Sequence, residues 1–138
     1  IKDISVSTIF YMEALITDVN WLAVVVGAVL SFGLGWLWYS KSMFGEKWAA
    51  GSRITMDPNA PMGMALFAQA VATFLLAWVI GITETTNALS FAILIALTIA
   101  VLIKSNGLWT KKSHYAIMVE SGFILAMVAV MIATHAVL

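Results

Sequence analysis

The chain has 138 residues, of which 62% are hydrophobic and only 10% are charged, and its formal net charge is zero. Soluble domains carry roughly 25% charged residues, so this composition excludes an ordinary soluble protein and favours lipid as the solvent of most of its surface. The balanced charge provides no broad basic field for nucleic acid. The absence of cysteine excludes disulfides, thiolate catalysis and iron–sulfur ligation.

Residues 1–19 differ from the rest of the chain. Their apolar run is interrupted by polar residues, so the segment is too short and too polar to cross a bilayer. Ile9, Met12, Ile16 and Val19 repeat at helical spacing. We therefore predict an interfacial amphipathic extension over residues 1–19, with a disordered tail as the alternative.

Long windows with few charges mark the membrane spans in residues 20–138. At 1.5 Å per residue, about 20 residues cross a hydrocarbon core about 30 Å thick. The windows predict helices at about residues 21–39, 62–82, 89–103 and 115–137. We expect an all-α membrane protein in which one domain, residues 20–138, forms a compact bundle of four transmembrane helices.

The basic residues predict how the chain is oriented. Six of the seven Lys and Arg residues lie in two loops, residues 40–61 and 104–114. An even number of spans places both loops on one side of the membrane, and the positive-inside rule makes that side cytoplasmic. Both termini are then outside. Within the second loop, Asn106-Gly107 predicts a turn.

Aromatic and basic residues gather where the first and third spans end. Trp and Tyr favour the headgroup layer, where Lys meets anionic lipid. The pattern predicts a short surface helix over residues 42–50 and an anchoring belt on anionic lipid, with a docking surface for a partner as the alternative. The residues are Trp36, Trp38, Tyr39, Phe44, Lys47 and Trp48, and the arrangement repeats at Trp109, Lys111 and Lys112.

Small residues recur every four positions in the predicted spans. Such faces let helix backbones approach closely in lipid. We predict helix packing within one chain through these faces, and self-association or complex formation is the alternative use. The residues are Gly27, Ser31 and Gly35 in the first span, Ala92, Ala96 and Ala100 in the third, and Gly122 and Ala126 in the fourth.

Glu120 lies well inside the fourth predicted span. A carboxylate in a membrane is costly and needs a partner or a wet cavity. No basic residue lies one helical turn away, so we expect the partner to come from another helix or loop, with Lys47, Arg53, Lys104 and the Tyr39 hydroxyl as candidates. Its role is a structural tether or, alternatively, a proton, ion or cofactor function. Gln69 is similarly placed and is predicted to donate a hydrogen bond to another helix.

The two histidines give no metal site within one chain. His114 and His135 are 21 residues apart on one predicted helix, which separates them by roughly 31 Å. No motif for nucleophilic catalysis or phosphate binding is present in the sequence. We therefore expect a protein that is not an enzyme and that has no metal or cofactor.

One block of residues resembles a known family. Asn20-Trp21 opens a glycine-bearing first helix, and Trp38-Tyr39-Ser40 and Phe44-Gly45-x-x-Trp48 follow. Together they resemble the small bacterial membrane proteins of domain-of-unknown-function family 1761, over residue 20 to about residue 137. At Lys41 the family often has proline, so we expect a helix that continues past the membrane surface in place of a rigid turn there. The resemblance implies four helices and an integral location in the bacterial inner membrane, and it implies no activity.

These observations favour a non-enzymatic membrane protein that acts by helix packing. It would be a homo-oligomer or an accessory subunit of a larger inner-membrane complex. The alternative is a small proton- or ion-coupled transporter that uses Glu120. Small multidrug transporters are of similar length, but they carry their essential carboxylate in the first helix, where this chain has none.

Overall fold

The computed structural model describes the backbone of residues 2–138 and the side chains of residues 5–138. Four of the helices in this part of the chain are long and apolar enough to cross a membrane, which agrees with the number of spans predicted from the sequence. In chain order the helices are α1 (Lys2–Glu13), α2 (Trp21–Trp38), α3 (Gly45–Gly51), α4 (Gly63–Thr85), α5 (Leu89–Trp109) and α6 (His114–Val137).

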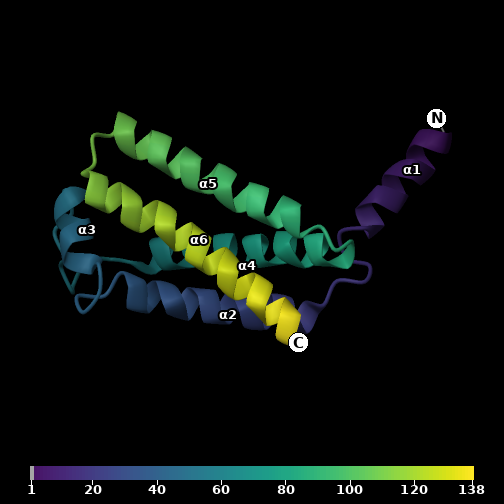
Figure 1. Ribbon diagram of the computed structural model, residues 1–138, viewed down its shortest axis with the longest axis horizontal. Helices are drawn as coiled ribbons and strands as arrows, with labels where there is room; N and C mark the ends of the chain where they lie inside the picture. Colours follow the sequence, from purple (N-terminus) through teal and green to yellow (C-terminus); the bar gives the residue numbers. More distant parts are fainter. Residues whose placement is uncertain (1) are drawn as a thin grey trace.

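The last helix is the centre of the packing. α6 contacts α2, α3, α4 and α5, and it contributes more buried side chains than any other helix described. Its Phe123, Met127 and Met131 form the hydrophobic core together with Val24 of α2 and Ile80 of α4. Figure 1 shows α6 running between α5 and α2.

Small residues bring α2 close to α6. A Cβ added at Gly27 would lie 3.6 Å from Cα of Met131, so the two backbones nearly touch. One turn further along, the buried Ser31 hydroxyl donates a hydrogen bond to the carbonyl oxygen of Met127 at 3.4 Å. At Gly35 an added Cβ would lie 2.9 Å from the Phe123 ring. This face of α2 is therefore used within the chain.

Small residues also lie on the other helices that contact α6. Ala92, Ala96 and Ala100 are the buried alanines of α5, which packs against α6. On α6 itself, Gly122 lies beside the Trp38 ring, and Ala126 is half-buried. The predicted packing residues thus lie at helix contacts inside one chain or at their margins.

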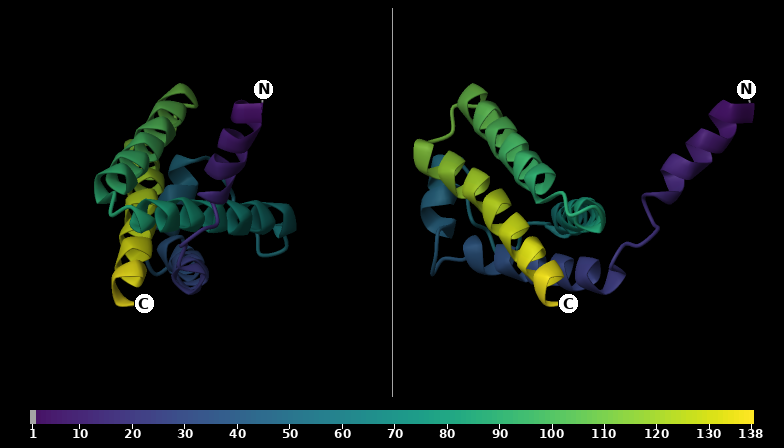
Figure 2. Two further views of the ribbon diagram at one scale, coloured as in Figure 1. Left: turned by 90° about the vertical axis from the view of Figure 1, so that its right-hand side faces the viewer. Right: turned by 45° about the vertical axis from the view of Figure 1, so that its right-hand side comes forward.

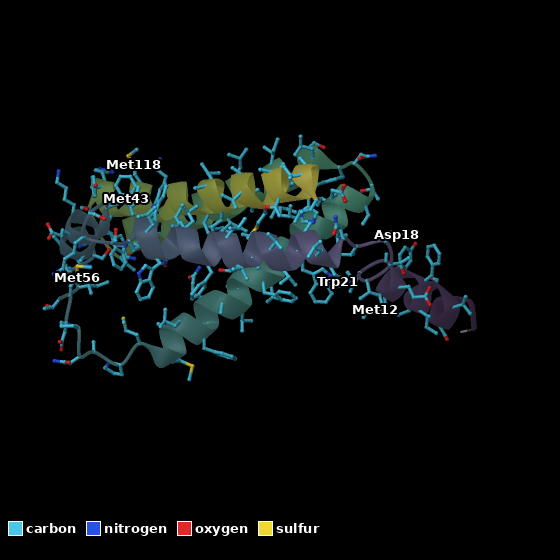
Figure 3. The ribbon with its side chains drawn as sticks, turned by 90° about the horizontal axis from the view of Figure 1, so that it is seen from below. Met12, Asp18, Trp21, Met43, Met56 and Met118 are labelled. Carbon is cyan, nitrogen blue, oxygen red and sulfur yellow. The ribbon has the colours of Figure 1, made fainter. Side chains whose placement is uncertain are left out.

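The bundle is less compact than we expected, because α4 leaves it. α4 packs on α2 and α6 through Thr73, at the middle of the helix, and through Ala77, Ile80 and Gly81 in its second half. Residues 61–72 are all exposed. Figure 2 shows α4 running across the direction of α5 and α6, and Figure 3 shows its first half diverging from α2. An open cleft lies beside this half of α4, with Gln69 of α4 on one side and Leu102 and Asn106 of α5 on the other.

The third span continues further than the sequence indicated. α5 runs through Lys104 and through Asn106-Gly107 to Trp109, so the predicted Asn-Gly turn is wrong. Gly107 is buried, and an added Cβ would lie 2.6 Å from a side-chain carbon of Ile117. The missing side chain at Gly107 lets α5 approach α6 closely, and no turn forms there. The chain reverses at residues 110–113, where Lys111 has a positive φ of 56°.

The N-terminal extension is helical from residue 2 to residue 13, whereas residue 1 lies outside the described residues. α1 projects away from the other helices (Figure 1), and its described side chains are exposed. The spacing predicts one helical face from Ile9 to Val19, and this is wrong, because the helix ends at Glu13 and Ile16 and Val19 lie beyond it. The segment between α1 and α2 forms a hydrogen bond with α4, in which Trp78 Nε1 donates to the Leu15 carbonyl oxygen at 2.7 Å.

The two basic loops meet at one end of the molecule. The Ser113 amide donates to the Gly51 carbonyl oxygen at 3.0 Å, and the Arg53 guanidinium donates to the Thr110 and Lys111 carbonyl oxygens. In Figure 3, Met43 and Met56 of the first loop lie at the end opposite Asp18 and Trp21. The chain thus gathers its two predicted cytoplasmic loops into one surface.

Candidate functional site

Glu120 is held by two donors from different parts of the chain. It lies six residues into α6, or roughly 9 Å along the helix axis. Its Oε1 accepts hydrogen bonds from Lys112 Nζ at 2.7 Å and from Trp48 Nε1 at 3.0 Å. The Lys112 and Glu120 side chains are 23% and 18% exposed, respectively. Charge-assisted bonds of this kind are stronger than neutral ones, so the pair compensates a carboxylate at this depth.

The partner of Glu120 differs from the candidates named from the sequence. Lys47, Arg53 and Lys104 were expected, but the ion pair is formed by Lys112, which precedes the α6 N-cap residue Ser113. A search at a spacing of one helical turn misses it, because Lys112 lies eight residues before Glu120. A search at two turns would have included it. Trp48 lies 72 residues away, so only the folded chain identifies this donor.

Four aromatic residues from the end of α2 to α3, with Phe123 of α6, form an aromatic clamp around this site. The set is Trp38, Tyr39, Phe44, Trp48 and Phe123. Trp38 packs against Phe44 and Tyr39 packs against Trp48, both with ring centroids 4.8 Å apart. The Trp38 and Tyr39 rings also contact the Phe123 ring. Trp38 Nε1 donates to the Val119 carbonyl oxygen at 3.0 Å, next to Glu120.

The clamp changes the interpretation of the aromatic sequence. Trp38, Tyr39, Phe44 and Trp48 are half-buried and pack within the chain, so they are not simply an outward-facing lipid belt. Trp36 and Trp109 are 70% and 85% exposed. Lys47 lies over the Tyr115 ring at 5.4 Å, and Lys111 is exposed in the loop before α6. For these four residues a membrane-interface role remains a prediction.

Tyr39 follows the last residue of α2 and lies beside the carboxylate. Burial raises the pKa of its phenol, and the negative charge of Glu120 raises this pKa further. The hydroxyl therefore stays protonated at neutral pH and can donate a hydrogen bond. Among the side chains that the structure describes, none accepts a hydrogen bond from it, so its donor capacity is available to a ligand or to water.

Glu120 and Tyr39 also line the cleft beside α4. It has a volume of about 400 Å³, and its polar lining comes from Tyr39, Gln69, Asn106 and Glu120. Each polar residue comes from a different segment, and all four lie near the helix ends that adjoin the two basic loops. Its apolar lining consists of Ile99, Leu102, Ile103, Phe123 and Ile124. A volume of this size with a few convergent polar groups is typical of a small-molecule site.

Gln69 does not form the interhelical hydrogen bond that we predicted. Its Nε2 donates to Thr73 Oγ1 at 3.2 Å, within α4 itself. The divergence of α4 explains the difference, because residues 63–72 of this helix are exposed and not packed against the other described helices. The amide oxygen of Gln69 has no hydrogen-bond donor among the described residues, and the residue lines the cleft.

The histidines lie at opposite ends of α6. His114 is the first residue of this helix, whereas His135 is buried near its C-terminus. His135 Nδ1 is 3.0 Å from the Met131 carbonyl oxygen, and its Nε2 is buried without a hydrogen-bond partner in the described part of the chain. Within residues 5–138 no group of three His, Asp or Glu side chains could hold a metal ion.

Comparison with known proteins identifies the family of this chain. The family model described as a protein of unknown function, DUF1761, matches residues 22–136, which include the four long apolar helices except the first residue of α2 and the last of α6, and the whole site around Glu120. Neither the curated proteins nor the solved structures provide a match. Because the family model covers most of the chain, the chain belongs to the DUF1761 family of proteins of unknown function.

Proposed function

We propose that the protein is a non-enzymatic component of the bacterial inner membrane that acts by helix packing, as a homo-oligomer or as an accessory subunit of a larger complex. The observation that carries this proposal is the first half of α4, which leaves its own bundle and exposes residues 61–72. Met64 and Phe67 are 81% and 67% exposed on this half. A second polypeptide would give it the helix contacts that this chain lacks.

The bonding of Glu120 supports a structural tether over a transport role. A carboxylate that couples transport has to release and bind its proton or ion in each cycle. Oε1 of Glu120 instead receives two donors, Lys112 and Trp48, which join α6 to the preceding loop and to α3. A transport cycle would have to break both hydrogen bonds each time, and this would release α6 from the preceding loop and from α3. The tether is therefore the role that we propose for Glu120.

Native mass spectrometry after mild extraction from the source membrane tests the proposed assembly. We expect an assembly larger than one chain of 14.9 kDa. A multiple of this mass identifies a homo-oligomer, and release together with larger subunits identifies an accessory role. A chain that stays monomeric under conditions that preserve a control membrane complex would contradict the proposal.

Cysteine labelling in intact cells tests the proposed orientation. The chain has no cysteine, so Thr55→Cys and Thr86→Cys each introduce a single reporter at an exposed threonine. Both termini and Thr86 are proposed to face outward, and Thr55 the cytoplasm, because the loops with six of the seven basic residues favour that side. An impermeant maleimide should label Thr86→Cys alone. Labelling of both, or of Thr55→Cys alone, would refute the orientation.

A further inference from the structure

The cleft between α4, α5 and α6 contains polar groups that the fold leaves unused. Oε1 of Glu120 accepts both Lys112 and Trp48, so Oε2 has no donor among the described residues. The Asn106 side chain forms no hydrogen bond within residues 5–138, and Gln69 uses only its nitrogen. With the Tyr39 hydroxyl, these groups line one cavity of about 400 Å³. The atoms that remain without a partner among the described residues are therefore Oε2 of Glu120, the Tyr39 hydroxyl, the Asn106 side-chain amide and the amide oxygen of Gln69.

The position of these groups indicates which kind of molecule could satisfy them. Glu120 and Gln69 each lie six residues from the start of their helices, which is roughly 9 Å along the axis, and Asn106 is three residues from the end of α5. In a membrane this places them just below the headgroup layer. Hydrocarbon tails offer no hydrogen bonds, so unused polar groups at this depth are costly. The headgroup of a lipid can reach them.

The charge of the site narrows the choice of headgroup. The free Oε2 of Glu120 accepts hydrogen bonds and donates none, so it favours an ammonium group with several N–H donors. Lys112 already balances Glu120, and a ligand with a single positive charge would add an uncompensated charge to a poorly solvated site. A zwitterionic ligand adds none. Its anionic part would lie near Lys104 and Lys111, which are exposed at the same end of α5.

We propose that this cleft binds a zwitterionic phospholipid through a primary ammonium headgroup. The ammonium donates to Oε2 of Glu120 and to the amide oxygens of Gln69 and Asn106. The acyl chains leave the cleft sideways along the exposed Leu102 and the half-buried Ile103. The proposal rests on the membrane location put forward above, but it does not depend on the oligomeric state.

Lipid retention measured by native mass spectrometry tests the site. The protein is purified in micelles that contain equal amounts of phosphatidylethanolamine, phosphatidylcholine and phosphatidylglycerol. We expect phosphatidylethanolamine to be retained about tenfold more than either of the others, because the choline head has no N–H donor and the glycerol head has no cation. Equal retention of the three lipids, or preference for phosphatidylglycerol, would overturn the proposal.

Two variants on neighbouring residues locate the binding. Leu102 and Val101 are both 63% exposed on α5, but only Leu102 lines the cleft. Leu102→Trp should reduce phosphatidylethanolamine retention about tenfold, and Val101→Trp should leave it unchanged. Equal effects of the two variants would place the lipid elsewhere. As a second readout, Gln69→Leu removes one acceptor without filling the cleft, and it should also weaken the preference for phosphatidylethanolamine.

The same mass spectra test the lipid site and the proposed oligomer or complex separately. A monomer that keeps its selective lipid would contradict only the proposed oligomer or complex. An oligomer without bound lipid, which Leu102→Trp converts to monomers, would mean that a second copy occupies the cleft. That result would overturn the lipid site while supporting the assembly.

Discussion

Replacement of Lys112 by methionine should lower the free energy of unfolding by about 2 kcal/mol, between the value of an exposed ion pair and that of a fully buried one. The side chains of Lys112 and Glu120 are 23% and 18% exposed, so water screens their attraction only in part. The variant leaves a carboxylate inside the α6 span with Trp48 as its only donor among the described residues. Unfolding of the purified protein in mixed micelles, followed by circular dichroism, measures the change.

The neighbouring lysine provides the matched control for this experiment. Lys111 is exposed, and its side chain forms no hydrogen bond with a described residue, so Lys111→Met should change the stability by less than about 0.5 kcal/mol. A loss as large for Lys111→Met as for Lys112→Met would show that the ion pair does not stabilise the fold.

A double variant separates the tether from the transport role. Glu120→Gln keeps an oxygen that can accept from Trp48, and the freed Lys112 can extend to the headgroups, so we expect a loss of only about 1 kcal/mol. Adding Lys112→Met to this variant should then cost little more, because no carboxylate remains to be paired. If both single variants were instead stable but unable to support proton movement across vesicle membranes, Glu120 would be a coupling residue.

The spans could be predicted from the sequence because they depend on a property of each segment alone. Bilayer thickness sets the length of an apolar window, and charges mark its ends. Three of the four predicted helices agree with α2, α4 and α6 to within three residues at each end. α5 is the exception because Asn106-Gly107 is a turn signal only when nothing packs against it. Here Ile117 of α6 fills the space at Gly107, and the helix continues.

The site could be predicted only in part. The unusual position of Glu120 is visible in the sequence, because a carboxylate in an apolar window is conspicuous. Its surroundings are not visible, since Trp48 and Phe123 come from distant parts of the chain. The cleft could not be predicted either, because it depends on the crossing angle of α4. That angle follows from side-chain packing in the second half of the helix, and no periodic pattern in the sequence encodes it.

The block that resembles the family now has a structural explanation. Trp38 and Tyr39 supply two rings of the aromatic clamp, and Phe44 packs on Trp38. Three residues after Gly45, Trp48 reaches Glu120. The block therefore encodes the turn that returns the chain from the end of α2 to the side of α6. Its spacing is set by contact with this one helix.

Gly45→Ala should be among the most destabilising single substitutions in the protein, with a loss of about 3 kcal/mol in the free energy of unfolding. An added Cβ would overlap the Tyr39 carbonyl oxygen and would lie 2.8 Å from that of Ser40. Both are backbone atoms, so no side chain can rotate away to make room. The Gly45 amide also donates to the Ser40 carbonyl oxygen at 2.9 Å, which fixes the turn. Unfolding in mixed micelles measures the loss.

Gly63→Ala is the matched control, because Gly63 is the first residue of α4 as Gly45 is of α3. No heavy atom lies within 4 Å of a Cβ added at Gly63, apart from its own neighbours in the chain, and alanine favours a helix over glycine by up to about 1 kcal/mol. Gly63→Ala should therefore leave the stability unchanged or raise it. Since displacement of α3 would also remove the Trp48 donor, Gly45→Ala should enlarge the difference in stability between Lys112→Met and Lys111→Met, because Lys112 would then be the one remaining donor to Glu120 among the described residues. If Gly45→Ala were as stable as Gly63→Ala, the turn after α2 would not be closed by this contact, and Trp48 would need another route to Glu120.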